Sequence, residues 1–261
     1  MRIALGVEYN GSQFCGWQRQ SNAETVQQRL EEAISIVANT PTTTTTAGRT
    51  DTGVHATEQI VHFDCDKERE LKAWVMGVNT NLPNSISVLW AKLVDDDFHA
   101  RYSAQSRRYR YVILNQATRP ALLDRLVTWE YVALNLQKMQ HAAQHLLGTH
   151  DFTSYRAVAC QAESSIRTID EITLSKHDEF IFMDICANGF LHHMVRNIMG
   201  VLIDIGKGES SENWSLDVLQ KCDRTLGGVT APAAGLYLVK VQYDKNFGLD
   251  TRIKWPAIAN G

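Results

Sequence analysis

This chain of 261 residues lacks cysteine motifs, long apolar runs and a strong net charge. Its five cysteines are widely spaced and form no CxxC pair, which argues against a disulfide framework or structural zinc and favours a reducing cytoplasm. No apolar run approaches the roughly 18 residues that a membrane helix needs. The first residues alternate and then turn polar, so we read them as a strand and not as a signal peptide.

Positive charge is scarce overall but locally concentrated. The formal net charge is −3, so the composition does not suggest a nucleic-acid-binding protein. If RNA is bound, its phosphates must meet a local group of cations. Arg101, Arg107, Arg108 and Arg110 fall close together in the sequence. A charge run of this kind is usually a solvated face, and both interpretations stay open at this point.

Turn residues and hydrophobic periodicity divide the chain into mixed strands and helices. The sequence predicts strands over residues 2–9, 42–46, 58–65, 86–93, 107–114, 127–132, 165–174, 180–187 and 236–243. It predicts helices over residues 24–38, 71–79, 136–147, 190–205 and 216–222. Hairpin-like neighbours outnumber long crossovers, which favours an α+β fold with a largely antiparallel sheet.

The chain is expected to form two α+β halves, residues 1–104 and 105–245, followed by a loose tail over residues 246–261.

Two local features fit the predicted elements poorly. Five successive threonines, residues 42–46, are read as a short edge strand because threonine is β-branched. Asp204 falls in the predicted helix of residues 190–205, where an apolar residue is expected.

The segment 47–56, with the sequence AGRTDTGVHA, carries the clearest chemical signal. It lies between two predicted strands, and its two glycines allow unusual backbone angles and the close approach of a ligand. Threonines on both sides of Asp51 can hold its carboxylate, and Arg49 can pair with it and keep it ionised. Such a carboxylate can act as a nucleophile or a general base. A structural turn aspartate with an arginine partner is the alternative.

These ten residues closely resemble the signature loop of the TruA family of tRNA pseudouridine synthases. Four further segments resemble the family's other motifs in the same order: residues 9–18, 98–111, 189–197 and 232–238. The resemblance implies the pseudouridine synthase fold, with two similar halves and a cleft between them. It also implies isomerisation of uridine to pseudouridine in the anticodon arm of tRNA, at positions 38, 39 and 40, by a homodimer without metal or other cofactor.

The resemblance also assigns roles to individual residues. Asp51 is the nucleophile, with Arg49 as its neighbour, and Arg196 meets the carboxylate inside the cleft. Tyr109 stacks on the flipped base and can take the proton that leaves C5. Whether the carboxylate attacks C6 of the base or C1′ of the ribose stays open. Without the family, Tyr109 reads as a core tyrosine and Arg196 as a snorkelling arginine.

The expected RNA contacts are largely basic. They are Arg19, Arg101, Arg107, Arg108, Arg110, His55 and His192, besides Tyr109. His192 and His193 are adjacent in a predicted helix, where side chains point about 100° apart, so we do not expect them to share a metal ion. Tyr102 stands where phenylalanine is more usual in the family.

Two other classes of protein compete with this interpretation. A non-catalytic RNA-binding α+β module would keep the arginines but would not need Asp51 together with Arg49, Tyr109 and Arg196. A hydrolase of glycosidic bonds usually needs a second carboxylate as general acid. The nearest acid, Glu58, falls on a predicted strand outside the loop.

Overall fold

The computed structural model describes residues 1–158, 160, 162–249 and 252–259, which fold as two compact units. The first unit contains Met1–Gln105 and Tyr237–Pro256, and the second contains Ser106–Leu236 and the residues after Pro256. The division after Gln105 lies beside the one expected after residue 104. The last strand belongs to the first unit, although the sequence pattern placed it in the second half.

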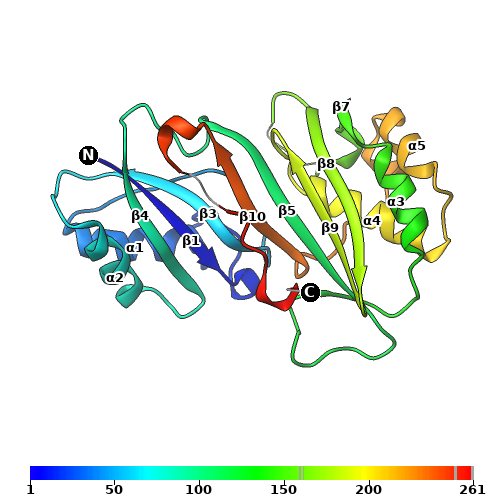
Figure 1. The fold of residues 1–261 in the computed structure, drawn as a ribbon, viewed down its shortest axis with the longest axis horizontal. Coiled ribbons are helices and arrows are strands. Elements are labelled where there is room, and N and C mark those ends of the chain that lie inside the picture. Colours follow the sequence, from blue (N-terminus) through cyan, green and yellow to red (C-terminus); the bar gives the residue numbers. More distant parts are fainter. Residues whose placement is uncertain (159, 161, 250–251, 260–261) are drawn as a thin grey trace. The chain divides into compact units, whose positions relative to one another are not determined.

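The first unit is built on a mostly antiparallel sheet (Figure 1). Its strands are β1 (Arg2–Tyr9), β2 (Thr45–Thr46), β3 (His55–Asp64), β4 (Ile86–Val94) and β10 (Leu236–Tyr243). Their spatial order is β4-β1-β3-β10, with β2 beside β3. Strand β1 is central because most of its side chains are buried on both faces. Strand β10 runs parallel to β3, with Tyr237 opposite His55.

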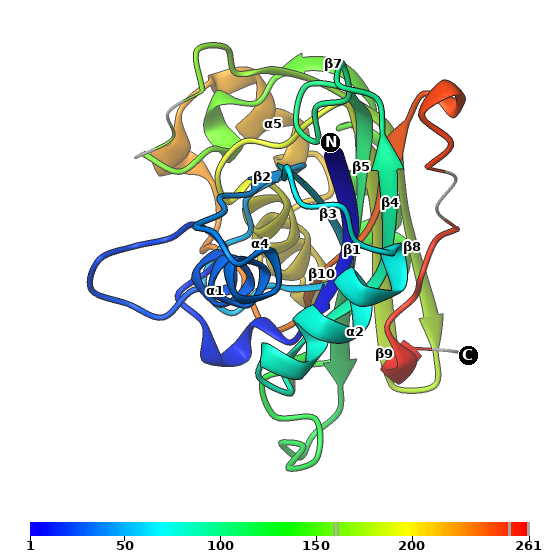
Figure 2. The ribbon, with the colours of Figure 1, turned by 90° about the vertical axis from the view of Figure 1, so that its left-hand side faces the viewer.

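Helix α1 (Val26–Ala38) covers one face of this sheet, and α2 (Leu71–Asn81) packs against α1 and β4 (Figure 2). The side chain of Thr25 caps α1 by accepting a hydrogen bond from the Gln28 amide at 3.3 Å. The capping sequence therefore forms at the predicted place, two residues after the predicted helix start. The apolar stripe of α1, which includes Leu30, is buried against the sheet.

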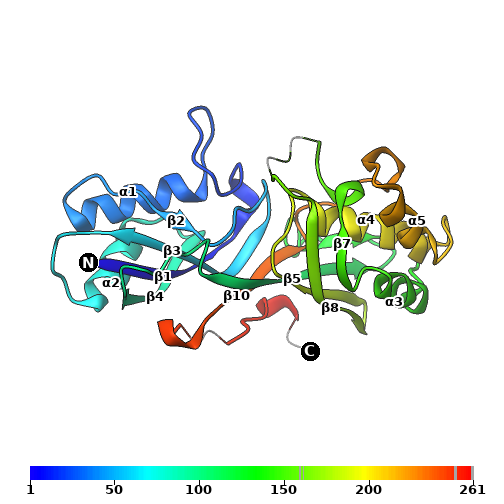
Figure 3. The same ribbon diagram turned by 90° about the horizontal axis from the view of Figure 1, so that it is seen from above.

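Residues 244–249 and 252–256, which follow β10 in the first unit, lie on the opposite face of the same sheet (Figure 3). The Lys92 ammonium donates a hydrogen bond to the Gly248 carbonyl. The Lys254 ammonium lies 2.9 Å from the carboxylate of Glu58, which is 1% exposed. The described part of the expected loose tail is therefore attached to the sheet by polar contacts.

The threonine tract lies against α1 and forms only a short strand. Of residues 42–46, only Thr45–Thr46 pair as β2. The buried Glu31 carboxylate accepts hydrogen bonds from the amide and hydroxyl of Thr44, at 2.8 and 3.2 Å. The tract is thus held by a specific acceptor, which the monotonous sequence did not reveal.

The second unit also has a mostly antiparallel sheet (Figure 1). Its strands are β5 (Ala104–Asn115), β6 (Thr128–Glu130), β7 (Gly148–Asp151), β8 (Ile166–His177) and β9 (Phe180–Ala187). Their order is β5-β9-β8-β7, and β6 runs parallel to β5. Strand β7 was not predicted, because it is only four residues long and lacks an apolar alternation. The predicted α+β class with a largely antiparallel sheet is confirmed for both units.

The helices of the second unit are α3 (Leu136–Gln144), α4 (Met194–Lys207) and α5 (Trp214–Lys221), and they pack on one another. Helix α4 is almost entirely buried and ends at Gly208, whose φ of 81° suits a glycine cap. The predicted start of α4 at residue 190 is wrong. The helix begins at Met194 because His193 adopts a left-handed φ of 62°.

Asp204 is the polar exception within buried α4. Its side chain is half-buried, and burial raises the pKa of its carboxyl, with a further upward contribution from Glu209.

Among the described residues, none of the helices has the length and apolar character needed to cross a membrane.

Candidate active site

The loop between β2 and β3 presents Asp51, and hydrogen bonds hold its backbone at several points. The Ala47 amide donates to the Ile60 carbonyl at 2.8 Å, and the Gln59 side-chain amide donates to the Gly48 carbonyl at 2.7 Å. A short turn is closed by the Val54 amide, which donates to the Asp51 carbonyl at 3.1 Å. The backbone that carries the carboxylate is therefore fixed on both sides of the residue.

The segment after β1 wraps around this loop. The Trp17 amide donates to the Thr50 carbonyl at 3.0 Å. A Cβ atom at Gly16 would lie 2.8 Å from the Thr50 carbonyl oxygen, and Gly16 also has a φ of 80°. A Cβ atom at Gly11 would lie 1.9 Å from the Val54 carbonyl oxygen. Only glycine permits this close approach of the two backbones, so the N-terminal motif and the Asp51 loop form one structural unit.

Tyr9 joins the two segments through a buried hydrogen bond. Its hydroxyl lies 2.8 Å from the Thr50 hydroxyl, one residue before Asp51. The Tyr9 ring is 3% exposed and packs near the fully buried Trp17 ring, at a centroid distance of 5.8 Å. Burial raises the pKa of Tyr9, so it remains a neutral hydrogen-bonding group. The sequence pattern contained Tyr9 but did not show that it touches the loop.

His55 closes the other side of the loop and is buried. Its ring is 1% exposed, and its Nδ1 accepts a hydrogen bond from the Gly11 amide at 3.0 Å. The same ring stacks on Tyr237 of β10, with centroids 4.6 Å apart and planes inclined by 22°. His55 therefore joins the first turn after β1 to β10 beside the loop, and its RNA contact stays a prediction.

Asp51 is half-buried, whereas its neighbour Arg49 is exposed. Within the described part of the chain, the Arg49 guanidinium forms no ion pair with Asp51. The local pairing that the sequence suggested is therefore not formed. An exposed cation beside a half-buried carboxylate is instead oriented toward solvent, where an anionic ligand could meet it.

Tyr109 and Phe190 form an aromatic pair in the second unit. Tyr109 lies on β5, is 7% exposed, and meets the Phe190 ring edge to face at 5.2 Å and 88°. An edge-to-face partner fixes the orientation of a ring. Phe190 belongs to the segment that precedes α4, so the same segment orients Tyr109 and leads to Arg196.

Arg196 occupies the first turn of α4 and is half-buried. Its Nε donates a hydrogen bond to the Ala231 carbonyl at 2.9 Å, and the Ala231 amide returns one to the Arg196 carbonyl at 3.1 Å. This double contact fixes the stem of the side chain. The snorkelling arrangement that the sequence alone suggested does not describe a side chain held in this way.

His192 and His193 precede α4 instead of lying within it. Their ring centroids are 4.0 Å apart, so the two side chains do not diverge as they would on a helix. The helical argument against a shared ion therefore rested on a wrong premise. His192 is exposed and His193 half-buried.

Arg108 and Arg110 of β5 form ion pairs with carboxylates on other strands: Arg110 reaches the neighbouring β9, and Arg108 reaches across β9 to β8. Arg108 donates to both carboxylate oxygens of Glu171 at 2.9 and 2.6 Å, and Arg110 donates to both oxygens of Asp184 at 2.8 and 2.7 Å. The Arg110 guanidinium also lies 5.0 Å from the centroid of Phe182. These charges are largely neutralised within the second unit, so they are poorer phosphate ligands than their sequence clustering suggested.

The remaining predicted cations are more accessible. Arg101 is exposed, and Arg107 donates to the Asn188 carbonyl at 3.1 Å from a half-exposed position. Arg19 pairs at 3.1 Å with buried Glu31 while about half of its side chain, 54%, stays exposed. Exposed side-chain surface therefore distinguishes Arg19 and Arg101 from Arg108 and Arg110.

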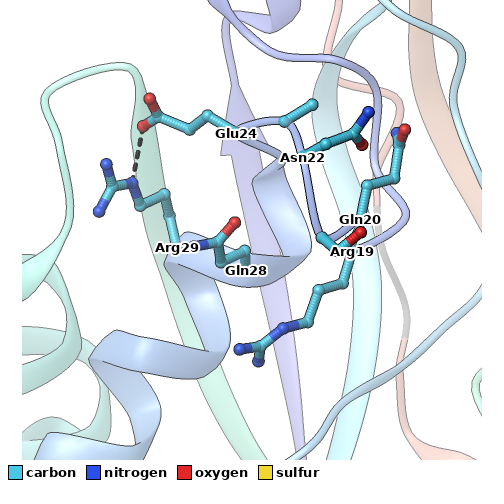
Figure 4. A pocket seen from close by; sticks show the side chains of 8 residues that line it. Arg19, Gln20, Asn22, Glu24, Gln28 and Arg29 are labelled. Atoms are coloured by element: carbon cyan, nitrogen blue, oxygen red, sulfur yellow. Dashed lines mark hydrogen bonds and ion pairs between the residues drawn. The ribbon is translucent and has the colours of Figure 1, made fainter.

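Arg19 belongs to the loop before α1, which borders an open polar hollow of about 450 Å³. Figure 4 shows Gln20 and Asn22 on this loop, with Glu24 and Arg29 joined by an ion pair of 2.6 Å on the helix side. No apolar side chain larger than alanine lines the hollow. It is a surface suited to polar ligands and not a pocket for an apolar molecule.

The fold and the site define an α+β protein that presents Asp51 on a loop whose backbone is held by hydrogen bonds. The model of a family described as tRNA pseudouridine synthase matches residues 6–103 and 142–244, and this chain belongs to that family. The expected family is therefore confirmed. Asp51 and Arg196 lie inside the matched ranges, whereas Tyr109 lies between them.

Several bacterial relatives are similar to the chain over nearly its whole length, and each is named tRNA pseudouridine synthase A. The Legionella pneumophila (strain Corby) protein is 55% identical over 249 residues, covering 95% of each chain. The Photobacterium profundum protein is 53% identical with the same coverage. The Pseudomonas aeruginosa protein is 53% identical over 261 residues, covering 100% of this chain and 92% of the relative.

One solved structure, a Cbf5-Nop10-Gar1 complex, contains a chain that aligns at a TM-score of 0.39 and 9% identity. The alignment covers 90% of this chain and 48% of that chain. A likeness at this level carries no argument about the fold or the site.

Proposed function

We propose that this protein isomerises uridine to pseudouridine in tRNA, with the carboxylate of Asp51 as its reactive group. The observation that carries the proposal is the clasp around the Asp51 loop. The Tyr9 hydroxyl, the Trp17 amide and the close backbone contacts of two glycines hold the loop before any substrate binds. Preorganisation of this kind is what a catalytic carboxylate requires.

The reaction needs few chemical groups. The bond between N1 and C1′ breaks, the uracil turns, and C5 forms a new bond to C1′. C5 then loses a proton and N1 gains one, so atoms and electrons balance without a redox step. An aspartate oxygen can assist by adding to C6 of the base or by stabilising C1′ of the ribose during detachment. Both routes use the same oriented carboxylate.

We assign the other side chains of the proposed site by the resemblance and by the surroundings of each within its own unit. Tyr109, held edge to face by Phe190, would stack on the flipped base and accept the proton from C5. Arg196 would supply the cation for the Asp51 carboxylate. The exposed Arg49 would meet the anionic RNA backbone beside the target nucleotide.

The RNA contacts follow from accessibility. Arg19, Arg101 and Arg107 keep exposed surface from which they can reach phosphates, and exposed His192 can contact RNA as well. Arg108 and Arg110 would first have to leave their carboxylates. We further propose that the substrate region is the anticodon arm, at positions 38, 39 and 40, and that the protein acts as a cytoplasmic homodimer.

Incubation of the purified protein with unmodified tRNA transcripts, followed by mapping of pseudouridine, tests the proposal. We expect product at one or more of positions 38, 39 and 40, without any added cofactor. Binding of tRNA without product would favour the non-catalytic RNA-binding module instead. Product outside the anticodon arm would keep the reaction but contradict the proposed substrate region.

The clasp leads to a prediction for Tyr9→Phe. This change removes the hydroxyl that bonds Thr50 and leaves the ring in place. We expect kcat to fall about ten-fold or more, because small misplacements of a reacting group are costly. KM should change little, and the free energy of unfolding should fall by about 1 kcal/mol for one buried hydrogen bond. Steady-state kinetics and chemical denaturation measure these quantities.

Tyr155→Phe is the matched control. Tyr155 is also fully buried, and its hydroxyl donates to the Ser215 carbonyl at 2.9 Å within the second unit. We expect a similar loss of stability with kcat unchanged. A Tyr9→Phe variant with the kcat of the wild type, or equal losses of kcat in both variants, would contradict the proposed role of the clasp.

A further inference from the structure

Tyr102 is an aromatic side chain that the proposed reaction does not use and that the fold does not bury. It lies in the turn before β5 and is 76% exposed. One face of its ring stacks on the ring of His99, with centroids 4.3 Å apart and planes inclined by 29°. A large ring that stacks on one partner and keeps most of its surface exposed offers area for stacking.

The ring of His99 is in turn supported from the interior of the first unit. His99 meets His62 at 5.0 Å, and His62 meets the fully buried Phe98 at 5.9 Å. Phe98 packs on Tyr243 of β10 at 5.1 Å. A continuous column of rings therefore runs from the core to Tyr102, so the exposed ring stands on a rigid base.

The backbone of the turn is fixed as well. The His99 Nδ1 accepts hydrogen bonds from the amides of Arg101 and Tyr102, at 3.2 and 3.1 Å. The Ser103 amide donates to the His99 carbonyl at 2.9 Å, and the Ser103 hydroxyl accepts from the His99 amide at 2.9 Å. Little conformational entropy remains to be lost when a ligand stacks on Tyr102.

An exposed cation lies over the Tyr102 ring. The exposed Arg101 guanidinium lies 5.6 Å from the centroid of the Tyr102 ring. Burial, with a contribution from Arg2, lowers the pKa of His62 to about 4, and the same causes lower the pKa of His99. The stacked rings are therefore neutral at neutral pH, and Arg101 supplies the cation at the surface.

We propose that Tyr102 is a stacking platform for an unpaired base of the substrate tRNA, with Arg101 contacting the adjacent phosphate; this rests on the proposed function. Unpaired bases stack on exposed aromatic rings in single-strand RNA recognition, and arginine adds a phosphate contact. The tyrosine hydroxyl at the edge of the ring stays in solvent in this arrangement, so phenylalanine serves equally well.

The platform is separate from the site of the target uridine. His62 lies near the end of β3, and its Nδ1 accepts a hydrogen bond from the Ala100 amide at 3.1 Å. His55, beside the Asp51 loop, begins the same strand. The seven residue steps from His55 to His62 span about 23 Å. A single nucleotide cannot reach both places. The base on Tyr102 is therefore another nucleotide of the same tRNA, and the platform acts on affinity rather than on chemistry.

The test uses the full chain and an unmodified tRNA transcript as the probe. For Tyr102→Ala, we expect KM and the Kd of the tRNA to rise about ten-fold, with a smaller change in kcat. Tyr102→Phe should stay close to the wild type. Arg101→Gln should lower the slope of log Kd against log salt by about one, whereas Tyr102→Ala should leave that slope unchanged.

Tyr131→Ala is the matched control, because Tyr131 is also a largely exposed tyrosine, 67%, and contacts the Trp129 ring within the second unit. We expect its KM and Kd to match the wild type. Tyr102→Ala should keep the melting temperature of the wild type because the ring is exposed. An unchanged melting temperature also rules out misfolding as the cause of weaker binding.

Three outcomes would overturn the platform. Wild-type KM and Kd in Tyr102→Ala would show that no base stacks there. Equal losses in Tyr102→Phe and Tyr102→Ala would show that the hydroxyl and not the ring is used. A change in oligomeric state with unchanged Kd would make Tyr102 a protein contact. In each of these outcomes the wild type still binds tRNA and forms pseudouridine, so only the platform fails. If the wild type itself neither binds tRNA nor forms pseudouridine, the proposed function fails, and the platform fails with it.

Discussion

Asp51→Asn is expected to abolish pseudouridine formation while leaving the protein folded. Asparagine keeps the size and shape of the side chain but removes the anionic oxygen that adds to C6 or stabilises C1′. Loss of a nucleophile typically costs at least about 10⁴-fold in turnover. Single-turnover assays with excess enzyme and unmodified tRNA measure this loss, and thermal unfolding checks the fold.

Asp66→Asn is a suitable control for this variant. Asp66 is an exposed aspartate of the same unit and lies outside the proposed site. Its turnover and tRNA affinity should equal those of the wild type. The clasp around the Asp51 loop should remain in Asp51→Asn because its hydrogen bonds join the Tyr9 and Thr50 hydroxyls and backbone atoms. Product from Asp51→Asn at a rate near that of the wild type would refute the carboxylate as the reactive group.

Arg196→Ala is the second change with a large expected effect. We expect turnover to be lost, because the Asp51 carboxylate would lose the cation that we propose for it. The fold should survive, although the hydrogen bond from Nε to the Ala231 carbonyl is removed and costs about 1 kcal/mol. Single-turnover kinetics and thermal unfolding measure the two effects separately.

Arg196→Lys separates charge from geometry. Lysine restores the positive charge but lacks the planar fork of the guanidinium, so it should recover only part of the lost turnover. Full recovery would mean that the charge alone matters. Near-normal turnover in Arg196→Ala would remove Arg196 from the proposed site.

Local sequence signals predicted many of the regular elements well. Strand β1 occupies the predicted residues because alternating apolar side chains end at an asparagine-glycine turn. Helix α1 has its predicted cap, since a threonine three residues before a glutamine forms local hydrogen bonds. Such signals act within a few residues of the chain, so a single sequence contains them in full.

These local signals do not show which distant strands or side chains pair with one another. Strand β10 joins the first unit by pairing with β3, although some 180 residues separate Tyr237 from His55 in the chain. The periodicity of an apolar strand predicts that the strand is buried but not which other strand it pairs with. For the same reason the pattern of arginines suggested an RNA surface, whereas Arg108 and Arg110 face carboxylates on β8 and β9.

The beginning of α4 shows another limit of periodicity. The apolar stripe continues upstream of the helix, so the pattern predicts a start at residue 190. The left-handed backbone of His193, with a φ of 62°, interrupts the helix. A positive φ is uncommon for residues other than glycine, so the histidine itself does not indicate it. Consequently the placement of His192 and His193 was predicted wrongly, although the residues belonged to a recognised motif.

The sequence by itself determined the family of this protein, its α+β class and the identity of Asp51 as the candidate nucleophile. Those inferences depend on residue types, their order and their local spacing, and a single sequence contains all of this information. The tertiary structure decided what holds Asp51 in place: Tyr9 on Thr50, Gly11 and Gly16 against the loop backbone, and Tyr237 on His55. It also decided which cations remain accessible. Both depend on contacts between segments distant in the chain, which only folding brings together.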